Sequence, residues 1–144
     1  MKIAVRPARE SDLAGVLGQL RQAGLPLEGV EEHFAHFLVA EAGPDLLGAI
    51  GMEVYGSEAL LRSAVVTPDW RGRGVGTMLH DALVECAASL GVTRIVLLTT
   101  TAEAFFARRG FRTIPAASIG GPLRMSSEFQ GACPSTAVCM ERRL

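Results

Sequence analysis

A glycine-rich segment, Arg-Gly-Arg-Gly-Val-Gly at residues 71–76, runs directly into a helical stripe of apolar residues. The stripe recurs at three- and four-residue spacing and ends at Gly91; it consists of Met78, Leu79, Ala82, Leu83, Cys86, Ala87 and Leu90. Backbone N–H groups free of side chains, followed by the positive end of a helix dipole, form a binding place for anions. Alternate glycines beside Arg71 and Arg73 therefore suit a diphosphate. A flexible turn that only caps the helix is the alternative interpretation.

Two familiar phosphate-binding motifs do not match this segment. The dinucleotide fingerprint G-x-G-x-x-G requires glycine where Thr77 stands, and a P-loop requires Gly-Lys-Ser/Thr. Both motifs therefore fail on spacing.

The elements around the loop predict an α/β fold in one domain, residues 1–144. The apolar run Ile95–Leu98 is typical of a strand covered on both faces, so strand, loop, helix and strand form a parallel crossover. Leu46–Tyr55 and Glu58–Val66 form a hairpin across Gly56-Ser57. Further elements are expected as strands at 3–6, 37–40, 111–114 and 136–142, helices at 10–23 and 102–109, helical turns at 30–35, and a partly helical excursion between 115 and 134.

The hairpin register can be counted from its turn. If Tyr55 faces Glu58, then Glu53 faces Leu60, and Arg62 faces a glycine. These side chains share one face of the sheet, with Arg62 diagonal to Glu53. This is the one polar cluster that the strand pairing produces.

The composition of the chain argues against several classes of function. Fourteen Lys and Arg residues against fifteen Asp and Glu give a net charge of −1, which argues against a nucleic-acid binder and favours a small neutral or zwitterionic partner. No apolar run approaches the ~18 residues of a membrane span. Three cysteines without CxxC spacing, and a start without an apolar leader, predict a reduced, cytoplasmic protein. His80 is expected on the polar face of its helix, and no residue pattern predicts a metal site.

Three segments resemble landmarks of the GCN5-related N-acetyltransferase (GNAT) superfamily. Val66–Gly76 is similar to its acetyl-CoA signature, Ala104–Phe111 to its A-x-[FY]-[FY]-x-x-x-G-F segment, and Ile3–Leu13 to its first strand and helix. More narrowly, residues 60–63, 98–102, 127–129 and 133–137 resemble the small N-acetyltransferases of arsenic-resistance operons, which are related to amino-acid acetyltransferases.

The resemblance implies a single-domain fold with a mixed, mostly antiparallel sheet, splayed between its central strands and covered by helices on both faces. It implies acetyl-CoA as cosubstrate. By family position, the Ala64 N–H faces the thioester oxygen, and the backbone of Val66, with Val65 beside it, lies along the pantetheine arm. The remaining residues expected at the cofactor are Arg71, Gly72, Arg73, Gly74, Val75, Gly76, Thr77 and Phe106.

The usual catalytic positions of the family are altered here. Relatives often carry an acid or base at the positions of Leu60 and Arg62, neither of which can accept a proton. This points to Glu53 as the base or the anchor of a water, with a salt bridge to Arg62 as the alternative. Phe106 stands where relatives place a proton-donating tyrosine. Tyr55, the one tyrosine of the chain, is therefore the candidate donor, with simple packing as the alternative.

Arg62 offers a planar fork for the carboxylate of an acceptor, with a structural ion pair as the alternative. Arg124 and Ser127, with Ser126, lie in the excursion that often borders the acceptor pocket in this superfamily. The loop 25–29 is expected to form the opposite wall.

The combined interpretation is an N-acetyltransferase that acts by direct attack in a ternary complex. Its acceptor is the primary amine of a small amino-acid-like molecule, and the narrower resemblance suggests an arsenic-containing or other toxic analogue. Acetylation of a protein or peptide, and a non-catalytic acyl-CoA-binding module, are the alternatives. The sequence leaves the oligomeric state open, and the resemblance to a superfamily whose members are often dimers makes a homodimer one candidate state.

Overall fold

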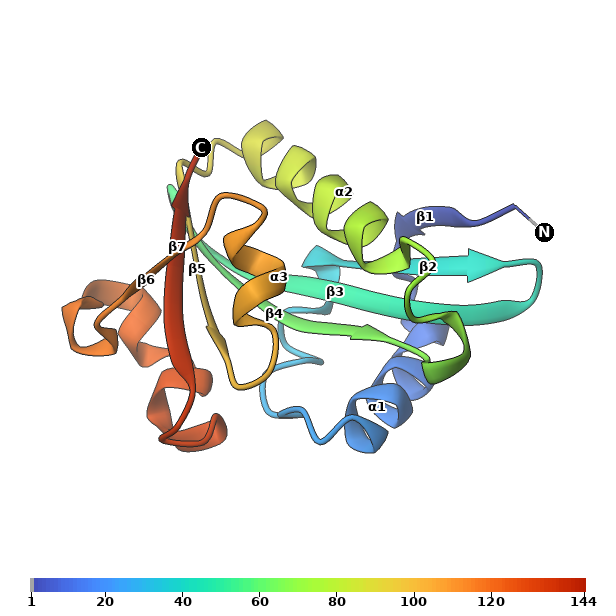
Figure 1. Cartoon of the computed structure of the whole chain (residues 1–144), viewed down its shortest axis with the longest axis horizontal. Coiled ribbons are helices and arrows are strands. Elements are labelled where there is room, and N and C mark those ends of the chain that lie inside the picture. Colours follow the sequence, from blue (N-terminus) through green and yellow to red (C-terminus); the bar gives the residue numbers. More distant parts are fainter. Residues whose placement is uncertain (1) are drawn as a thin grey trace.

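The computed structural model describes residues 2–144, which form a seven-stranded mixed sheet of order β1-β2-β3-β4-β5-β7-β6 (Figure 1). The strands are β1 (Ala4–Pro7), β2 (Phe37–Ala42), β3 (Asp45–Tyr55), β4 (Glu58–Val66), β5 (Arg94–Thr99), β6 (Arg112–Ile114) and β7 (Val138–Arg143). The helices are α1 (Leu13–Gln22), α2 (Val75–Ser89) and α3 (Glu103–Ala107). Between them lie the short turns η1 (Glu10–Asp12), η2 (Phe34–His36), η3 (Pro68–Trp70), η4 (Ala116–Ser118), η5 (Gly121–Met125) and η6 (Glu128–Ala132). The predicted α/β architecture is confirmed.

Helices cover both faces of the sheet. Figure 1 shows α2 and α3 on one face and α1 on the other. Under α2 the core contains Leu79, Leu83, Ile95, Leu97 and Phe106; under α1 it contains Val16, Leu20, Phe37, Val39 and Val65. A third cluster lies under the excursion and contains Leu60, Val96, Ile119, Leu123 and Cys139.

The counted hairpin register is confirmed. Tyr55 pairs with Glu58, Glu53 with Leu60, and Gly51 with Arg62. A two-residue turn leaves the chain one pairing, and every second residue then faces the same side. Glu53 and Arg62 are thereby buried together beneath the excursion.

The predicted splay lies between β4 and β5. These strands run parallel and pair over Glu58–Leu60 and Arg94–Val96. Beyond this point β4 carries a bulge, because three steps from Arg62 to Val65 match two steps from Gly51 to Ala49 on β3. Ser63 adopts φ 61° there. The bulge turns the rest of β4 away from β5 and leaves an opening between them.

Gly48 lies against the backbone at this bulge, and its replacement tests the packing of β3 on β4. A Cβ at Gly48 would lie 2.3 Å from the Val65 carbonyl oxygen, which cannot move as a side-chain end can. Gly48→Ala is expected to lower the free energy of unfolding by about 2 kcal/mol in urea denaturation. The control Gly18→Ala lies in α1 with no atom within 4 Å and should raise it by ~0.5–1 kcal/mol. Equal effects of the two substitutions would contradict this packing.

The prediction for His80 was wrong. Its side chain is buried, with the ring packed against Phe105, Phe106 and Phe111, and its Nδ1 lies 2.9 Å from Asp81. The apolar stripe marks the face of α2 that meets the sheet, but α3 and the following chain cover a second side of the helix. The helical turns expected at 30–35 are likewise shorter, with η2 spanning Phe34–His36.

Candidate functional site

A cavity of about 650 Å³ lies in the opening between β4 and β5. Its walls come from β4 (Leu61–Val66), the end of β5, α2 and α3. One end reaches Arg71 and Gly76 at the glycine-rich loop, and the other reaches Arg62 and Glu128. The loop 23–26 contributes a further wall. The cavity therefore connects the predicted anion-binding loop with the predicted polar cluster.

The loop end presents backbone amides. Gly72 and Gly74 have φ 76° and 83°, which residues with a Cβ rarely adopt, and Gly74 caps α2. The first helical bond runs from Met78 N–H to the Gly74 carbonyl at 3.0 Å. The N–H groups of Val75, Gly76 and Thr77 come before this bond, where the helix has no carbonyl to accept from them. Gly76 lines the cavity, so these amides are placed to bind an anion there.

Arginine side chains surround this end. Arg71 lines the cavity and donates from Nε to the Val66 carbonyl at 3.2 Å, and Arg108 also lines it, which the sequence did not predict. Arg73 lies 5.0 Å over the Trp70 ring. Arg109 stacks on Phe105 and donates to the Thr77 hydroxyl, which holds the Thr77 side chain against α3.

The middle of the cavity is the bulged segment of β4. Ser63, Ala64, Val65 and Val66 all line it, and Phe106 closes the side toward α3. Ile50 faces the bulged pair Ser63–Ala64 in the register with β3. The bulge thus releases the backbone at Ala64 from regular pairing, on the side where the sheet is open.

A buried polar cluster closes the other end. Arg62 donates from Nη1 to Glu53 Oε2 at 2.6 Å, and its side chain is 0% exposed. The Tyr55 hydroxyl donates to Glu53 Oε1 at 2.5 Å. Burial raises the pKa of Glu53, but the bonds from Tyr55 and Arg62 outweigh it and hold the pKa below its ordinary value. Burial and the Glu53 carboxylate raise the pKa of Tyr55.

Glu128 joins this cluster from η6 and was not predicted as a site residue. Its carboxylate lies 3.5 Å from Arg62 Nε, and the residue is 5% exposed. Burial raises the pKa of Glu128 to about 7, against the opposing effect of Arg62. Burial and Glu128 raise the pKa of the neighbouring Cys133 thiol to about 12. Glu128 lies in an excursion without hydrophobic periodicity, so no register could place it.

The expected opposite wall is present. Leu25 and Pro26 line the cavity, and the Ser127 hydroxyl donates to the Glu28 carbonyl at 3.2 Å. Gly29 has φ 84°, and a Cβ there would lie 2.7 Å from Arg62 Nη1, so glycine lets the loop close on the cluster.

The Arg124 side chain forms its hydrogen bonds within the excursion. It donates to the carbonyls of Ile119 and Ala116 at 2.9 and 2.5 Å, and its guanidinium lies 5.2 Å over Phe129. Its predicted contact with the acceptor stays a prediction.

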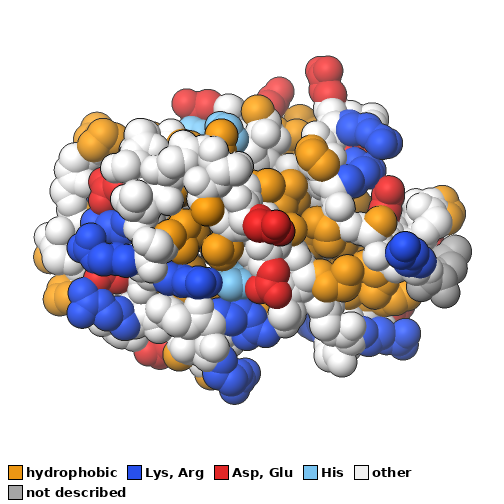
Figure 2. All heavy atoms as spheres, turned by 90° about the horizontal axis from the view of Figure 1, so that it is seen from above, with side chains coloured by type: hydrophobic (Ala, Val, Ile, Leu, Met, Phe, Trp, Pro, Cys, Tyr) orange, Lys and Arg blue, Asp and Glu red, His pale blue; other side chains and the backbone are white. Residues whose placement is uncertain are grey.

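Figure 2, which looks down on the side covered by α2, shows Lys and Arg side chains gathered over the end of the molecule that holds β6 and β7. Acidic side chains occupy the same face, so its charge is mixed. Among residues 2–144, no helix has the length and apolarity needed to cross a membrane, and no group of three His, Cys, Asp or Glu side chains is arranged to hold a metal ion.

A family model described as an acetyltransferase (GNAT) domain matches residues 33–113, which include β3, β4, the glycine-rich loop and α3. The chain belongs to the GNAT family. This membership supports the predicted activity, acetyl-CoA-dependent N-acetyl transfer. The match covers the loop and the bulged strand, the two features that line the cavity.

Curated relatives of this GNAT domain include amino-acid acetyltransferases. The protein from Neisseria meningitidis serogroup A is 25% identical over 120 residues, 77% of this chain but 28% of its own length. That from Mycobacterium tuberculosis is 37% identical over 92 residues, 60% of this chain and 49% of the relative. The chain thus spans under a third of the first of these relatives and about half of the second.

Solved structures confirm the fold. N-acetylglutamate synthase from Neisseria gonorrhoeae, complexed with coenzyme A and N-acetyl-glutamate, superposes with a TM-score of 0.83 at 23% identity, covering 100% of this chain and 35% of that one. Rv2747 from Mycobacterium tuberculosis, in complex with CoA and NLQ, gives 0.81 at 24% identity, covering 98% and 99%. The GNAT fold, with its splayed mixed sheet, is therefore confirmed.

Proposed function

We propose that this GNAT domain transfers the acetyl group of acetyl-CoA to the primary amine of a small amino-acid-like acceptor, by direct attack within a ternary complex. One observation carries the proposal: a single cavity joins a loop of free amides to a buried cluster of ionisable side chains. A ternary mechanism needs both substrates in one continuous space, and this cavity supplies it.

The loop end fits the diphosphate of acetyl-CoA. The amides of residues 75–77 and the cation of Arg71 supply the hydrogen bonds and charge that a diphosphate requires. Residues 72–74 shape the loop, and Arg73 adds charge beside it. In this proposal the pantetheine arm lies along Val65 and Val66, against Phe106, and the Ala64 N–H faces the thioester oxygen. Bound acetyl-CoA supplies the activated acetyl group.

Glu53 and Tyr55 act on the acceptor end through Arg62. The carboxylate of Glu53 is a weak proton acceptor, because its pKa is lowered, and Tyr55 retains its proton. We assign both a positioning role, in which they hold the Arg62 guanidinium at the cavity wall. Arg62 then forms the part of the cavity wall that meets the acceptor, and Ser127 fixes the opposing loop.

An amino acid is the favoured acceptor. The curated relatives are named amino-acid acetyltransferases, and the bond between Ser127 and Glu28 draws the loop across the acceptor end, which favours a small molecule over a peptide. Arsenic-containing and other toxic amino-acid analogues belong to the same acceptor class.

A thiol-release assay tests the function. The purified chain is supplied with acetyl-CoA and a panel of amino acids, amino-acid analogues, polyamines and peptides, and free thiol is followed. We expect turnover with amino-acid-like amines. Turnover with peptides alone would assign the domain to protein acetylation, and CoA binding without turnover on any amine would assign it to a binding module.

A further inference from the structure

We propose that Glu128 is the catalytic base of this domain and takes a proton from the ammonium group of the acceptor at the closed end of the cavity. The proposal rests on the proposed acetyl transfer to an amine. It replaces Glu53 in the role of base and gives a function to a residue in the excursion between β6 and β7.

Glu128 lies at the end of the cavity where the acceptor is expected. It lies in the cavity wall beside Arg62 and Cys133. Its backbone N–H donates to the Ser126 hydroxyl at 3.2 Å, which fixes the start of η6. The carboxylate thus stands at the end of the cavity remote from the anion-binding loop, where the acceptor has to enter a ternary complex.

Glu128 shares its cationic partner with a second carboxylate. Two buried carboxylates, Glu53 and Glu128, share one guanidinium, Arg62. Glu53 has the shorter ion pair and the added bond from Tyr55, so it holds the negative charge that Arg62 balances. Arg62 therefore compensates little of the negative charge of Glu128. The Glu128 carboxyl group can gain and lose a proton near neutral pH. When two carboxyl groups differ in this way, the less stabilised one is the proton carrier.

The other groups that face Glu128 do not compete for this role. Cys133 is half-buried beside it and keeps its thiol proton, Arg62 is a guanidinium with no lone pair to accept a proton, and Glu28 lies on the exposed loop. On the far side of Glu53, His33 lies 3.7 Å from that carboxylate rather than from Glu128. Glu128 is therefore the group in the cavity wall that can gain and lose a proton during turnover.

The step balances. One proton of the ammonium group passes to the Glu128 carboxylate, which leaves a neutral amine. The amine nitrogen forms a bond to the acetyl carbon, and the carbon–sulfur bond of the thioester breaks. The nitrogen gives a second proton to the departing sulfur, so the products are an amide and a free thiol. Glu128 then returns its proton to solvent.

Glu128→Gln tests the proposal, with Glu31→Gln as its matched control. Each replaces one glutamate by glutamine, but Glu31 is exposed and lies outside the cavity wall. With acetyl-CoA and an amino acid turned over by the wild type, Glu128→Gln should lower kcat by about a hundredfold, while KM for acetyl-CoA stays within about threefold. Glu31→Gln should change kcat by less than about threefold.

The pH profile separates a base from a packing residue. The wild-type kcat/KM for the acceptor should rise with pH to a plateau just above 7, as Glu128 loses its proton. The rise near pH 7 should persist in Glu128→Asp. In Glu128→Gln the remaining activity should instead rise only at the higher pH where the acceptor amine itself loses its proton. A rise near pH 7 retained in Glu128→Gln would overturn the proposal, as would loss of acetyl-CoA binding in that variant.

Carbon-13 NMR of glutamate carboxyls gives a second readout without turnover. One resonance should titrate near pH 7 and be missing in Glu128→Gln; its absence from the wild type would overturn the proposal. If the wild type shows this resonance but acetylates no amine, the proposed function is wrong. The catalytic role of Glu128 is then wrong as well, because there is no reaction for it to assist.

Discussion

Replacing Gly76 with leucine is expected to weaken coenzyme A binding on the order of a thousandfold in isothermal titration calorimetry. Gly76 lines the cavity in the first turn of α2, and a Cβ there would lie 3.5 Å from Phe105 and 3.9 Å from Val66. A larger side chain has to extend into the space where the diphosphate meets the amides. Loss of two charge-assisted hydrogen bonds, each worth about 2 kcal/mol, corresponds to this weakening.

Gly76→Ala is the control for this substitution. Its Cβ makes ordinary contacts with the neighbouring side chains, so coenzyme A binding should change by less than about fivefold. Both variants should unfold at similar urea concentrations, because neither alanine nor leucine opposes the helix. Unchanged binding by Gly76→Leu would show that the diphosphate does not lie at this helix start.

Arg62→Met is expected to lower the free energy of unfolding by about 4 kcal/mol. The guanidinium is fully buried between Glu53 and Glu128, and its removal leaves two carboxyl groups in the core without a cation. Breaking a buried ion pair by removing one partner carries a penalty of about this size. The loss is measured by urea denaturation at neutral pH.

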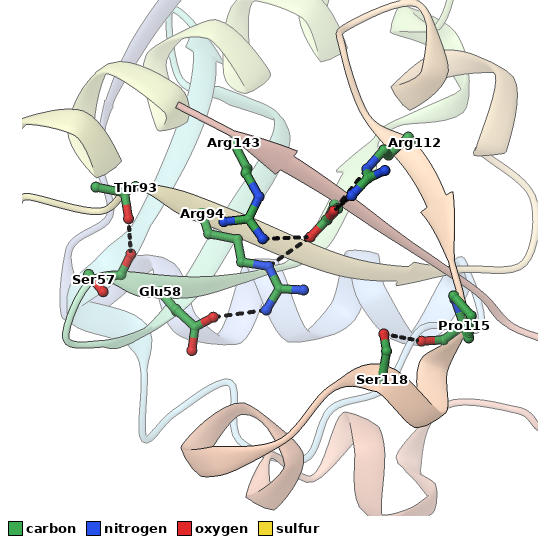
Figure 3. A network of polar contacts seen from close by, with 9 residues as sticks. Ser57, Glu58, Thr93, Arg94, Arg112, Pro115, Ser118 and Arg143 are labelled. Carbon is green, nitrogen blue, oxygen red and sulfur yellow. Dashed lines mark hydrogen bonds and ion pairs between the residues drawn. The ribbon is translucent and has the colours of Figure 1, made fainter.

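Arg112→Met is the matched control. Arg112 reaches Glu141 from β6, in the network that Arg94 and Arg143 share (Figure 3), but its side chain is 74% exposed. Removing the exposed Arg112 side chain leaves the buried Glu141 carboxylate paired with Arg94, so the expected change is about 0.5 kcal/mol. If Arg62→Met costs no more than Arg112→Met, the buried cluster is not a structural unit and the positioning role of Glu53 is wrong.

The residues that sequence alone could place are those governed by local rules. A two-residue turn fixes the hairpin register, so Glu53 and Arg62 could be paired by counting. The glycine-rich loop and the apolar stripe after it likewise identify the start of α2, because alternate glycines and helical spacing are both local signals.

The residues that escaped prediction depend on contacts made across the fold. His80 is buried because α3 covers a side of α2 that no local pattern marks. Glu128 reaches the cavity through an excursion of short turns, where neither period two nor period 3.6 applies. The positive φ of Ser63, which opens β4, has no sequence signal because serine rarely adopts it.

Binding of coenzyme A to the unmodified chain tests the central claim most directly. A calorimetric titration with coenzyme A is compared with one using pantetheine, which lacks the diphosphate. Saturable one-to-one binding of coenzyme A, with pantetheine bound at least about a hundredfold more weakly, is the predicted result. No heat with coenzyme A, or equal affinity for the two compounds, would contradict the assignment of the loop at residues 71–76.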